Sequence, residues 1–314
     1  MIEVSVIIVN WNTIDKLRDC LKSVYEQTLG IRFEVIVVDN ASTDGSARIV
    51  STEFTSAILI KNLQNRGFAS ASNQGIAVAQ GRYVLLLNSD TVVLDNAIAK
   101  TVHYADAHPN TAVVGCQVME NEHVVQMTCF RFPSVGNLFL VVSGLAKLFK
   151  YNRIMGRERF LWWGRDSERE VDVVPGMFML VRRKAIDKIG LLEEAFFMYS
   201  EDADWCYRFK QAGWKNVFWP GAKIIHVEGG SYSSDQNTLK MFVQKQKSTL
   251  IFLRKHGGLF DYMSGRAILF ISFGFKFFIW SIIWICSKIM SMDVKNEVVK
   301  KYWLAFKFCA TGAE

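Results

Sequence analysis

The sequence predicts an α/β protein with a mostly parallel central sheet flanked by helices, followed by a hydrophobic helical extension. Over the first hundred residues, continuously apolar runs alternate with amphipathic stretches, which is typical of parallel strands covered by helices on both faces. Near the other end, Arg266–Lys288 is an apolar run with one internal charge, Lys276. Half of the 314 residues are hydrophobic and 21% are charged, so the chain can bury a large core.

Strands and helices are predicted in turn along the first half of the chain. Residues 15–27 carry the apolar side chains Leu17, Leu21, Val24 and Tyr25 at helical spacing, and short apolar runs flank them on both sides. The predicted strands cover residues 3–11, 33–40, 57–62 and 83–88, and the predicted helices cover residues 15–27, the segment up to Phe54 and residues 69–79.

The second half is predicted to complete the compact part of the chain. Residues 112–131 have a strand-like pattern, Gly190 is expected to stop a short helix, and Ser200 is expected to cap a helix that runs to about Ala212. We predict further strands at residues 171–183, 216–220 and 222–226, and two domains, one over residues 1–230 and a helical one over residues 231–314.

Positive charge is concentrated in the predicted C-terminal region. From Lys240 onward lie 12 of the 37 Lys and Arg residues but only 4 of the 30 Asp and Glu residues. A tail on an anionic lipid leaflet gains about 1 kcal/mol per well-placed cation. Because Lys276 opposes a full membrane span, we expect this region to lie in the membrane interface. The alternative is a hydrophobic dimerisation hairpin, which would make a homodimer.

Cysteine spacing and the N-terminus indicate the compartment. The six cysteines are scattered, without the short spacing of a zinc knuckle or a redox dithiol, so a reducing compartment is expected. The first residues, MIEVSVIIVNWN, lack a basic region and have too short an apolar run for a span, so we predict no signal peptide.

Polar loops follow the predicted parallel strands. Ligands of such sheets bind beyond the carboxyl ends of the strands, which here means around Asp39, residues 62–67 and residues 88–90. No GxGxxG follows the first strand and no GxxxxGK[ST] occurs, so the usual dinucleotide and P-loop sites are excluded. The basic and aromatic stretch Leu145–Arg169 fits either an acceptor-binding flap or a nucleic-acid platform, and we favour the flap, with Trp163 in contact with substrate.

Six ordered motifs carry a family resemblance over residues 3–230. VSVIIVNWN, VIVVDNASTDGS, NRGFASASNQG, LLLNSDTVV, PGMFMLVRR and FFMYSEDADWCYR resemble the inverting family 2 glycosyltransferases with the GT-A fold, and among these the chain is most similar to rhamnosyltransferase-like members that build cell-surface polysaccharides. The resemblance implies a nucleotide-sugar donor, a lipid-linked or polysaccharide acceptor and no nucleic-acid partner.

The same resemblance implies roles for residues that match the motifs. Asp39 is expected to recognise the nucleotide base, and Asp202, with Glu201 beside it, is expected to be the catalytic base. Mg²⁺ or Mn²⁺ is expected to bind Asp90, the last acid of the family's DxD motif, and His226. The first acid of that motif is Asn88 in this chain, which is expected to contact substrate. Four further residues are expected to line the nucleotide pocket: Asn10, Asn12, Asn65 and Gly67.

The chemistry of sugar transfer explains these residue types. A divalent ion stabilises the negative charge of the departing diphosphate, and a base on the opposite face of the sugar takes the acceptor proton. A single carboxylate at Asn88-Ser89-Asp90 suffices, since Mg²⁺ commonly binds one or two carboxylates together with substrate phosphates. Residues 229–238 are expected to form a loop that orders over the donor.

The expected donor is dTDP-rhamnose, and the expected location is the cytoplasmic face of the bacterial inner membrane, as a peripheral or monotopic protein. Other donors, such as UDP-galactofuranose or UDP-N-acetylglucosamine, remain alternatives. So does a catalytically silent nucleotide-sugar-binding scaffold for a polysaccharide assembly complex.

Overall fold

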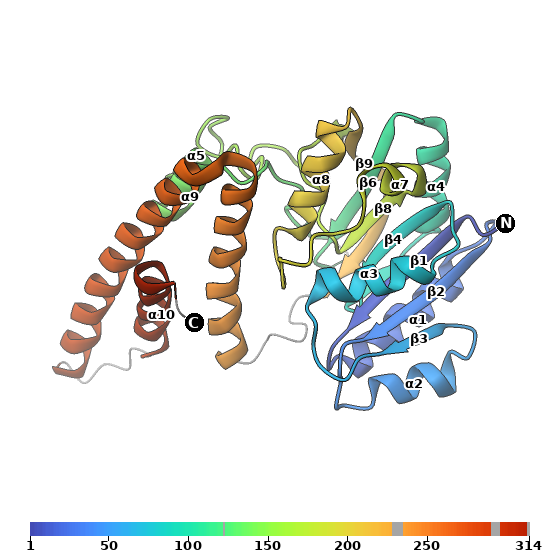
Figure 1. Cartoon of the computed structure of the whole chain (residues 1–314), viewed down its shortest axis with the longest axis horizontal. Helices are drawn as coiled ribbons and strands as arrows, with labels where there is room; N and C mark the ends of the chain where they lie inside the picture. The colour runs from blue at the N-terminus through green and yellow to red at the C-terminus, as the bar shows by residue number, and fades with distance from the viewer. Residues whose placement is uncertain (122, 228–234, 290–295, 313–314) are drawn as a thin grey trace. The chain divides into compact units, whose positions relative to one another are not determined.

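The chain forms two compact units (Figure 1). The computed structural model describes residues 1–121, 123–227, 235–289 and 296–312. The first unit combines Met1–Phe132 with Arg159–Ser231, and the second combines Pro133–Glu158 with Tyr232–Glu314. The sequence predicted a single domain boundary after residue 230, which left Pro133–Glu158 in the first domain. Pro133–Glu158 belongs with the C-terminal helices because Leu138 and Val142 pack into their hydrophobic core.

A mixed nine-stranded sheet is the centre of the first unit within the described residues. Strand β1 (Val4–Asn10) pairs in parallel with β2 (Phe33–Asp39) and β4 (Tyr83–Asn88), as predicted, while later strands add antiparallel pairs. The order is β3-β2-β1-β4-β8-β6-β9-β5, with β7 beside β9. The remaining strands are β3 (Ile58–Lys61), β5 (Thr91–Val93), β6 (Thr111–Met119), β7 (Arg169–Glu170), β8 (Phe178–Arg182) and β9 (Lys215–His226).

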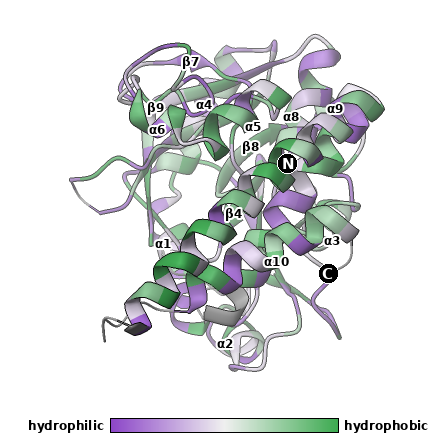
Figure 2. Cartoon of the chain, turned by 90° about the vertical axis from the view of Figure 1, so that its left-hand side faces the viewer, coloured by the Kyte–Doolittle hydropathy of each residue, from purple (hydrophilic) through white to green (hydrophobic). Residues whose placement is uncertain are grey.

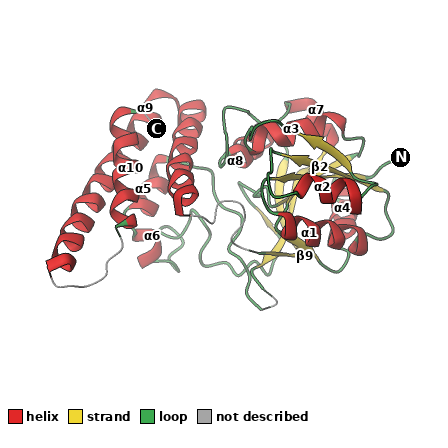
Figure 3. Cartoon of the chain, turned by 90° about the horizontal axis from the view of Figure 1, so that it is seen from below, coloured by secondary structure: helices red, strands yellow, loops and turns green. Residues whose placement is uncertain are grey.

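Helices cover both faces of this sheet (Figure 3). Successive side chains of β1 point to opposite faces. Val6 and Ile8 share one core with residues of α1, α2 and α4, whereas Ile7 packs against α3, where a side chain on Gly75 would lie only 2.6 Å from an Ile7 methyl group. The helices of this unit are α1 (Ile14–Gln27), α2 (Ser46–Glu53), α3 (Phe68–Val78), α4 (Ala97–Ala107), α7 (Arg183–Ile189) and α8 (Glu201–Gln211).

Three predicted details of the second half are corrected. Beyond β6, the chain makes isolated bridges at Val125 and Phe130 in place of a strand, because the carbonyl groups of Thr128 and Cys129 accept from the Arg165 guanidinium. The two short strands predicted around Pro220 are one strand, β9, with an irregular register there. Ser200 precedes α8 but makes no side-chain cap, since its φ of 65° is left-handed and its side chain donates and accepts no capping bond.

The second unit is helical. It contains α5 (Val135–Val142), α6 (Leu145–Leu148), α9 (Asp235–Ile289) and α10 (Glu297–Thr311). Gly258 interrupts α9 with a φ of 78°, so the element consists of two helices joined at a bend. Figure 2, in which each residue is coloured by its hydropathy, shows hydrophobic residues along much of these helices.

Two basic side chains hold the second unit together by capping helix C-termini. Arg266 donates to the carbonyl oxygens of Cys309 (2.7 Å) and Ala310 (3.0 Å) at the end of α10. Lys276 donates to the carbonyl oxygen of Val142 (2.6 Å), the last residue of α5. Cations are favourable at helix C-termini, where carbonyl groups lack intrahelical partners. The single internal charge of the apolar run is therefore hydrogen-bonded.

Candidate active site

The carboxyl ends of three parallel strands meet at one edge of the sheet, as predicted. Asn10 lies opposite Asp39, and Asn88 lies opposite Val9, the residue before Asn10. Parallel pairing in register places the ends of neighbouring strands side by side. The polar loops that follow β1, β2 and β4 are thereby gathered where sheets of this kind bind ligands.

A buried hydrogen-bond network surrounds Asp39. The side chain is 3% exposed, and one carboxylate oxygen accepts from the backbone N–H of Ser42 at 3.1 Å. The Asn10 amide donates to the other oxygen (3.4 Å) and to the Ser42 hydroxyl (3.1 Å). Asn12 accepts from the backbone N–H of Thr43 at 2.7 Å. Thus Asn10, Asn12 and Asp39 lie together, and Ser42 is the bridging residue that sequence reasoning missed.

A second set of amide side chains shapes the loop before α3. Asn40 donates to Asn65 at 2.8 Å and accepts from Asn62 at 3.0 Å. Asn65 also accepts from the backbone N–H of Gly67 at 3.0 Å. Gly67 has a φ of 80°, and a Cβ there would lie 2.3 Å from the Phe197 carbonyl oxygen. Only glycine fits both this left-handed backbone and this close approach.

Phe197 links the loop before α3 to the loop before α8. Its carbonyl oxygen accepts from the backbone N–H of Phe68 at 2.8 Å. Behind it, the Asn73 side chain on α3 donates to the Leu192 carbonyl and accepts from the Leu192 N–H, at 2.9 and 3.0 Å. The segment that leads into Glu201 is therefore anchored to α3, the helix that follows Gly67.

Asp90 and His226 meet across two strands. Thr91 of β5 pairs with His226 of β9, and His226 Nε2 lies 3.3 Å from an Asp90 carboxylate oxygen. Both side chains are 13% exposed. On the other side of the ring, His226 Nδ1 lies 3.2 Å from the Gln126 side-chain oxygen, a contact in which Nδ1–H donates. The other ring nitrogen, Nε2, faces Asp90 and is the atom that a cation at this site would meet.

This pair fits a divalent cation held partly by its substrate. A carboxylate oxygen and an imidazole nitrogen are suitable metal ligands. A hydrogen bond to the ring nitrogen that does not bind the metal, such as the Gln126 contact, orients a ligating histidine. Among the described residues, no group of three or more His, Cys, Asp and Glu side chains forms a protein-only metal site. Gln126 lies in a segment predicted as a strand, and no sequence signal pointed to it.

Asn88 and Ser89 connect the same edge to the hydrogen-bond network around Asp39. The Asn88 backbone N–H donates to the Met177 carbonyl at 3.2 Å, which positions the turn. The Ser89 hydroxyl lies 2.9 Å from that of Thr13, and the Thr13 hydroxyl donates to Asn10 at 2.6 Å. A continuous polar chain thus runs from Ser89 to Asn10 and on to Asp39.

Glu201 and Asp202 have different environments at the start of α8. Glu201 is 6% exposed, and within the described part of the chain its Oε2 has no hydrogen-bond partner. Burial, together with the charge of Asp202, raises the pKa of Glu201 well above its usual value. Asp202 is half-buried, and its Oδ1 accepts from the Ala203 N–H at 2.7 Å. Of the two acids, Asp202 is the accessible carboxylate.

Trp163 lies inside the first unit. Its ring is 5% exposed, packs edge-on against Phe218 and donates its N–H to Ser167 at 3.0 Å. The aromatic face is also covered by Arg165 and Arg169, whose guanidinium carbons lie 4.8 Å from the ring centre. In this structure, Trp163 is therefore a packing residue and offers no open face to substrate.

Arg165 organises the surrounding loop and was not identified from the sequence. Its side chain is fully buried and donates to backbone carbonyl groups only, including those of Thr128 (2.7 Å), Phe160 (2.8 Å) and Trp163 (2.6 Å). A buried guanidinium can satisfy several carbonyls at once because its five donors have a fixed geometry. It thereby ties residues 128–129 to residues 159–163.

The chain matches a family of known proteins and is similar in sequence to individual transferases. Residues 5–190 match the family described as Glycosyl transferase family 2. The chain is 26% identical over 238 residues to the N-acetylglucosaminyl-diphospho-decaprenol L-rhamnosyltransferase of Mycobacterium tuberculosis, covering 71% of this chain and 76% of that protein. It is 25% identical over 221 residues to Glycosyltransferase GlyG of Streptococcus pneumoniae, covering 68% and 67% respectively.

Solved structures agree on the fold. The mannosyltransferase of Pyrobaculum calidifontis in complex with GDP-Man and Mn²⁺ has a TM-score of 0.55 at 16% identity, over 99% of this chain and 88% of that one. GalNAc-T7 with UDP, GalNAc and Mn²⁺ has a TM-score of 0.57 at 15% identity, over 81% and 48%. These likenesses confirm the predicted GT-A fold. Since the family match spans more than half of the sequence, the chain belongs to glycosyltransferase family 2.

Proposed function

We propose that this glycosyltransferase works with inversion, moving rhamnose from dTDP-rhamnose to a lipid-linked acceptor. The observation that carries the proposal is the accessible Asp202 carboxylate at the first turn of α8, anchored through Phe197 to the loop that carries Gly67. The rhamnosyltransferase relative supports the choice of donor and of an acceptor that carries a diphosphate and a polyprenol.

In the proposed reaction, Asp202 is the general base. The acceptor hydroxyl oxygen forms a bond to the anomeric carbon while the bond from that carbon to the diphosphate oxygen breaks. Asp202 takes the hydroxyl proton, and the nucleoside diphosphate leaves with the bonding electrons. One displacement from the opposite face inverts the anomeric centre. A positioned general base typically contributes about 10²–10⁴-fold to the rate.

Donor recognition is assigned to the network at the sheet edge. Asp39 would accept hydrogen bonds from the nucleotide base, and Asn10, Asn12, Asn65 and Gly67 would line that pocket. The ordered amides hold the pocket before substrate arrives, which lowers the cost of binding. Of residues 229–238, predicted to close over the donor, residues 229–234 lie outside the described residues, and residues 235–238 begin α9 in place of a loop.

Asp90 and His226 would hold Mg²⁺ or Mn²⁺, with Asn88 beside them at the end of β4. When bound, such an ion supplies positive charge that stabilises the departing diphosphate. The imidazole nitrogen favours Mn²⁺ over Mg²⁺. Gln126 keeps His226 in the tautomer that presents Nε2 to the site.

The second unit would bind the protein to the cytoplasmic face of the bacterial inner membrane. One described stretch of α9, Thr238–Lys288, is long and apolar enough to cross a membrane, and little of its apolar part is buried. We favour an interfacial position, because Lys276 and the cations of this region suit an anionic surface. Exposed apolar side chains that would enter the lipid include Phe270, Phe275, Phe278 and Ile282.

A donor screen and one pair of variants test the proposal. Thermal shifts with dTDP, UDP and GDP sugars in the presence of Mn²⁺ should be largest with dTDP-rhamnose, because a ligand of the native state raises its stability. Asp202→Asn should still bind this donor but lose transfer, and the matched control Asp187→Asn, an exposed acid on α7, should keep it. Full transfer by Asp202→Asn would refute the assigned base.

A wild-type protein that binds nucleotide sugars but transfers none of them to any acceptor would instead favour the silent scaffold. Stabilisation by UDP-galactofuranose or UDP-N-acetylglucosamine alone would replace the proposed donor while leaving the reaction class unchanged.

A further inference from the structure

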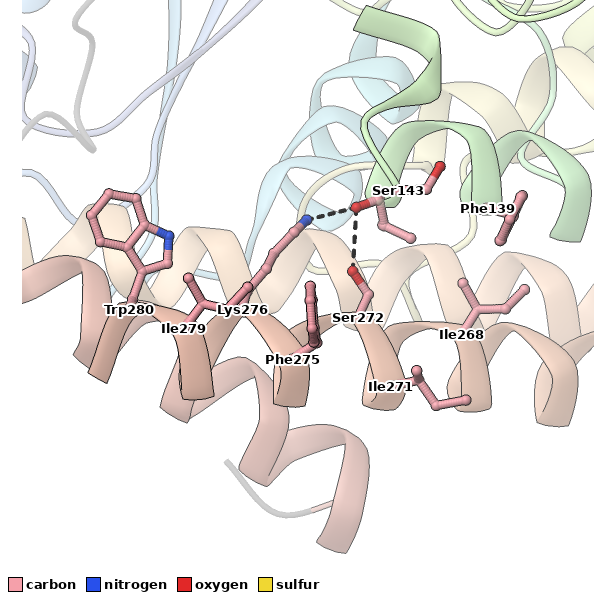
Figure 4. Close-up of a pocket in the computed structure, with 10 residues that line it drawn as sticks. Phe139, Ser143, Ile268, Ile271, Ser272, Phe275, Lys276, Ile279 and Trp280 are labelled. Carbon is pink, nitrogen blue, oxygen red and sulfur yellow. Dashed lines mark hydrogen bonds between the residues drawn. The ribbon is translucent and has the colours of Figure 1, made fainter. Parts of the chain in front are cut away.

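A cavity of about 470 Å³ lies within the second unit, along α5 and the second half of α9 (Figure 4). Its volume falls in the range of about 300–1,000 Å³ that is typical of small-molecule sites. Every residue that lines it belongs to one of these two helices or to Ser143, which directly follows α5. The cavity is therefore a property of the second unit alone.

One side of the cavity is a hydrophobic stripe on α9. Ile268, Ile271, Phe275, Ile279 and Trp280 recur at the spacing of one helical face. The stripe covers 13 residues, whose ends are about 18 Å apart along the helix. Ile271 and Phe275 are 69% and 65% exposed, so the groove is open along much of its length. This shape suits an extended hydrocarbon chain better than a compact ligand.

The opposite wall comes from α5. Phe139 and Val142 add apolar surface, and Ser143 lies at the end of that helix. Figure 4 shows the Lys276 side chain pointing towards the α5 wall, where its ammonium group donates to the Val142 carbonyl oxygen. The groove thus has apolar walls on two helices and a polar point between them.

That polar point carries positive charge. Lys276 donates to the Val142 carbonyl oxygen, which also accepts from the Ser272 hydroxyl at 3.3 Å. An ammonium group has three donors, and this bond uses one of them. Lys276 lines the groove. Among the described residues, no carboxylate lies within ion-pair distance of Lys276, so an anion in the groove would meet a cation that no acid neutralises.

We propose that the groove between α5 and α9 binds the hydrocarbon chain of a polyprenyl phosphate, with the phosphate at Lys276. The assignment rests on the proposed function in taking this lipid to be the acceptor or its carrier. Apolar walls alone would suit any lipid or a partner helix, and cations alone would suit free phosphate. An anionic single-chain lipid satisfies both parts of the groove at once.

A matched pair of phenylalanines tests the groove against simple membrane partitioning. Phe275 lines the groove and is 65% exposed, whereas Phe278, three residues further on the same helix, is 63% exposed and does not line it. Full-length protein in neutral phosphatidylcholine nanodiscs would be titrated with undecaprenyl monophosphate carrying a photoreactive group.

We expect Phe275→Ala to weaken this binding roughly tenfold, through loss of buried apolar contact, and Phe278→Ala to leave it within about twofold. The cross-link should map to residues 268–280 or to α5. Equal effects of the two substitutions, or cross-links spread over the exposed helices, would overturn the proposal, as would capture of a second copy of the chain in place of lipid.

The head group is tested with Lys276→Met and Lys276→Arg. Loss of a charge-assisted bond to phosphate should weaken binding by Lys276→Met about tenfold or more, with Lys276→Arg close to the wild type. Neutral undecaprenol should bind the wild type no better than it binds Lys276→Met. Competition by inorganic phosphate, or by phosphatidylglycerol at equal concentration, would show that the anion site does not select a polyprenyl lipid and would refute the assignment.

Transfer assays separate this proposal from the proposed function. With a water-soluble, short-chain acceptor, Phe275→Ala should transfer at the wild-type rate, whereas with a polyprenyl acceptor its KM should rise roughly tenfold. Asp202→Asn should fail with both acceptors. If the wild type transfers to no polyprenyl acceptor, the proposed function is wrong. The binding titration then still tests whether the groove binds a polyprenyl phosphate.

Discussion

Replacement of Glu201 by Gln should remove a loss of stability that the wild type undergoes as the pH rises. The buried carboxyl has a pKa well above the ordinary 4.5, mainly because burial disfavours its charged form. Between 4.5 and the folded value, the unfolded chain releases this proton and the folded protein keeps it. The folded state then binds more protons, so its stability falls as pH rises through this window.

The slope follows from linkage. Each pH unit in that window should cost wild type about 1.4 kcal/mol, and Glu201→Gln lacks this group. For a unit of roughly 200 residues, 1 kcal/mol corresponds to about 2–4 °C in Tm, so the Tm difference between variant and wild type should grow by about 3–5 °C per pH unit above pH 5. Any fixed effect of the amide on packing cancels in this slope.

Scanning fluorimetry of both proteins from pH 5 to pH 8 measures the difference directly. Glu120→Gln, which changes an exposed acid, is the matched control and should show a constant offset. A Tm difference between Glu201→Gln and wild type that does not change with pH would refute the protonated, buried carboxyl. Transfer by Glu201→Gln within about tenfold of wild type is also expected, since Asp202 is the proposed base.

Three further changes follow from the geometry of the first unit. Gly67→Ala should destabilise the protein by more than about 1 kcal/mol and weaken donor binding, because a Cβ would lie 2.3 Å from the Phe197 carbonyl oxygen; unchanged donor affinity by calorimetry would contradict this. The free protein should bind Mn²⁺ weakly and bind it much more tightly with donor, and His226→Ala should reduce the second affinity; tight binding without donor would exclude a site completed by substrate. Arg165→Met should lower the free energy of unfolding by about 3 kcal/mol or more, since several buried carbonyl groups lose their donor; chemical denaturation measures the change, and a loss under 1 kcal/mol would show that water replaces the guanidinium.

Local patterns were sufficient for the first 88 residues. The buried strands are continuously apolar and α1 has apolar residues at helical spacing, so each element follows from its own stretch of sequence. Parallel strands end at a common edge, so Asp39 and residues 88–90 were predicted to lie together, whereas Asn10 was placed beside Asp39 by the family resemblance. The family resemblance also identified Gly67 as a site residue, although nothing in the sequence identified Phe197 as its close neighbour.

Long-range contacts decided the remaining features. Gln126 reaches His226 across 100 residues, and Lys276 reaches Val142 across 134, so neither pair leaves a local signal. Pro133–Glu158 was likewise predicted to lie with the first domain, but its apolar face is covered by distant helices.

The sequence by itself determined the α/β order of elements, the family and the residue types gathered at the sheet edge, because strand period, turn chemistry and motif order are local properties. The tertiary structure alone decided which of two adjacent acids is buried and which is accessible. It also decided which carbonyl group accepts a hydrogen bond from Lys276, the one charged residue inside the apolar run. Burial and hydrogen bonding depend on the residues that surround a group in space, and those residues come from distant parts of the chain.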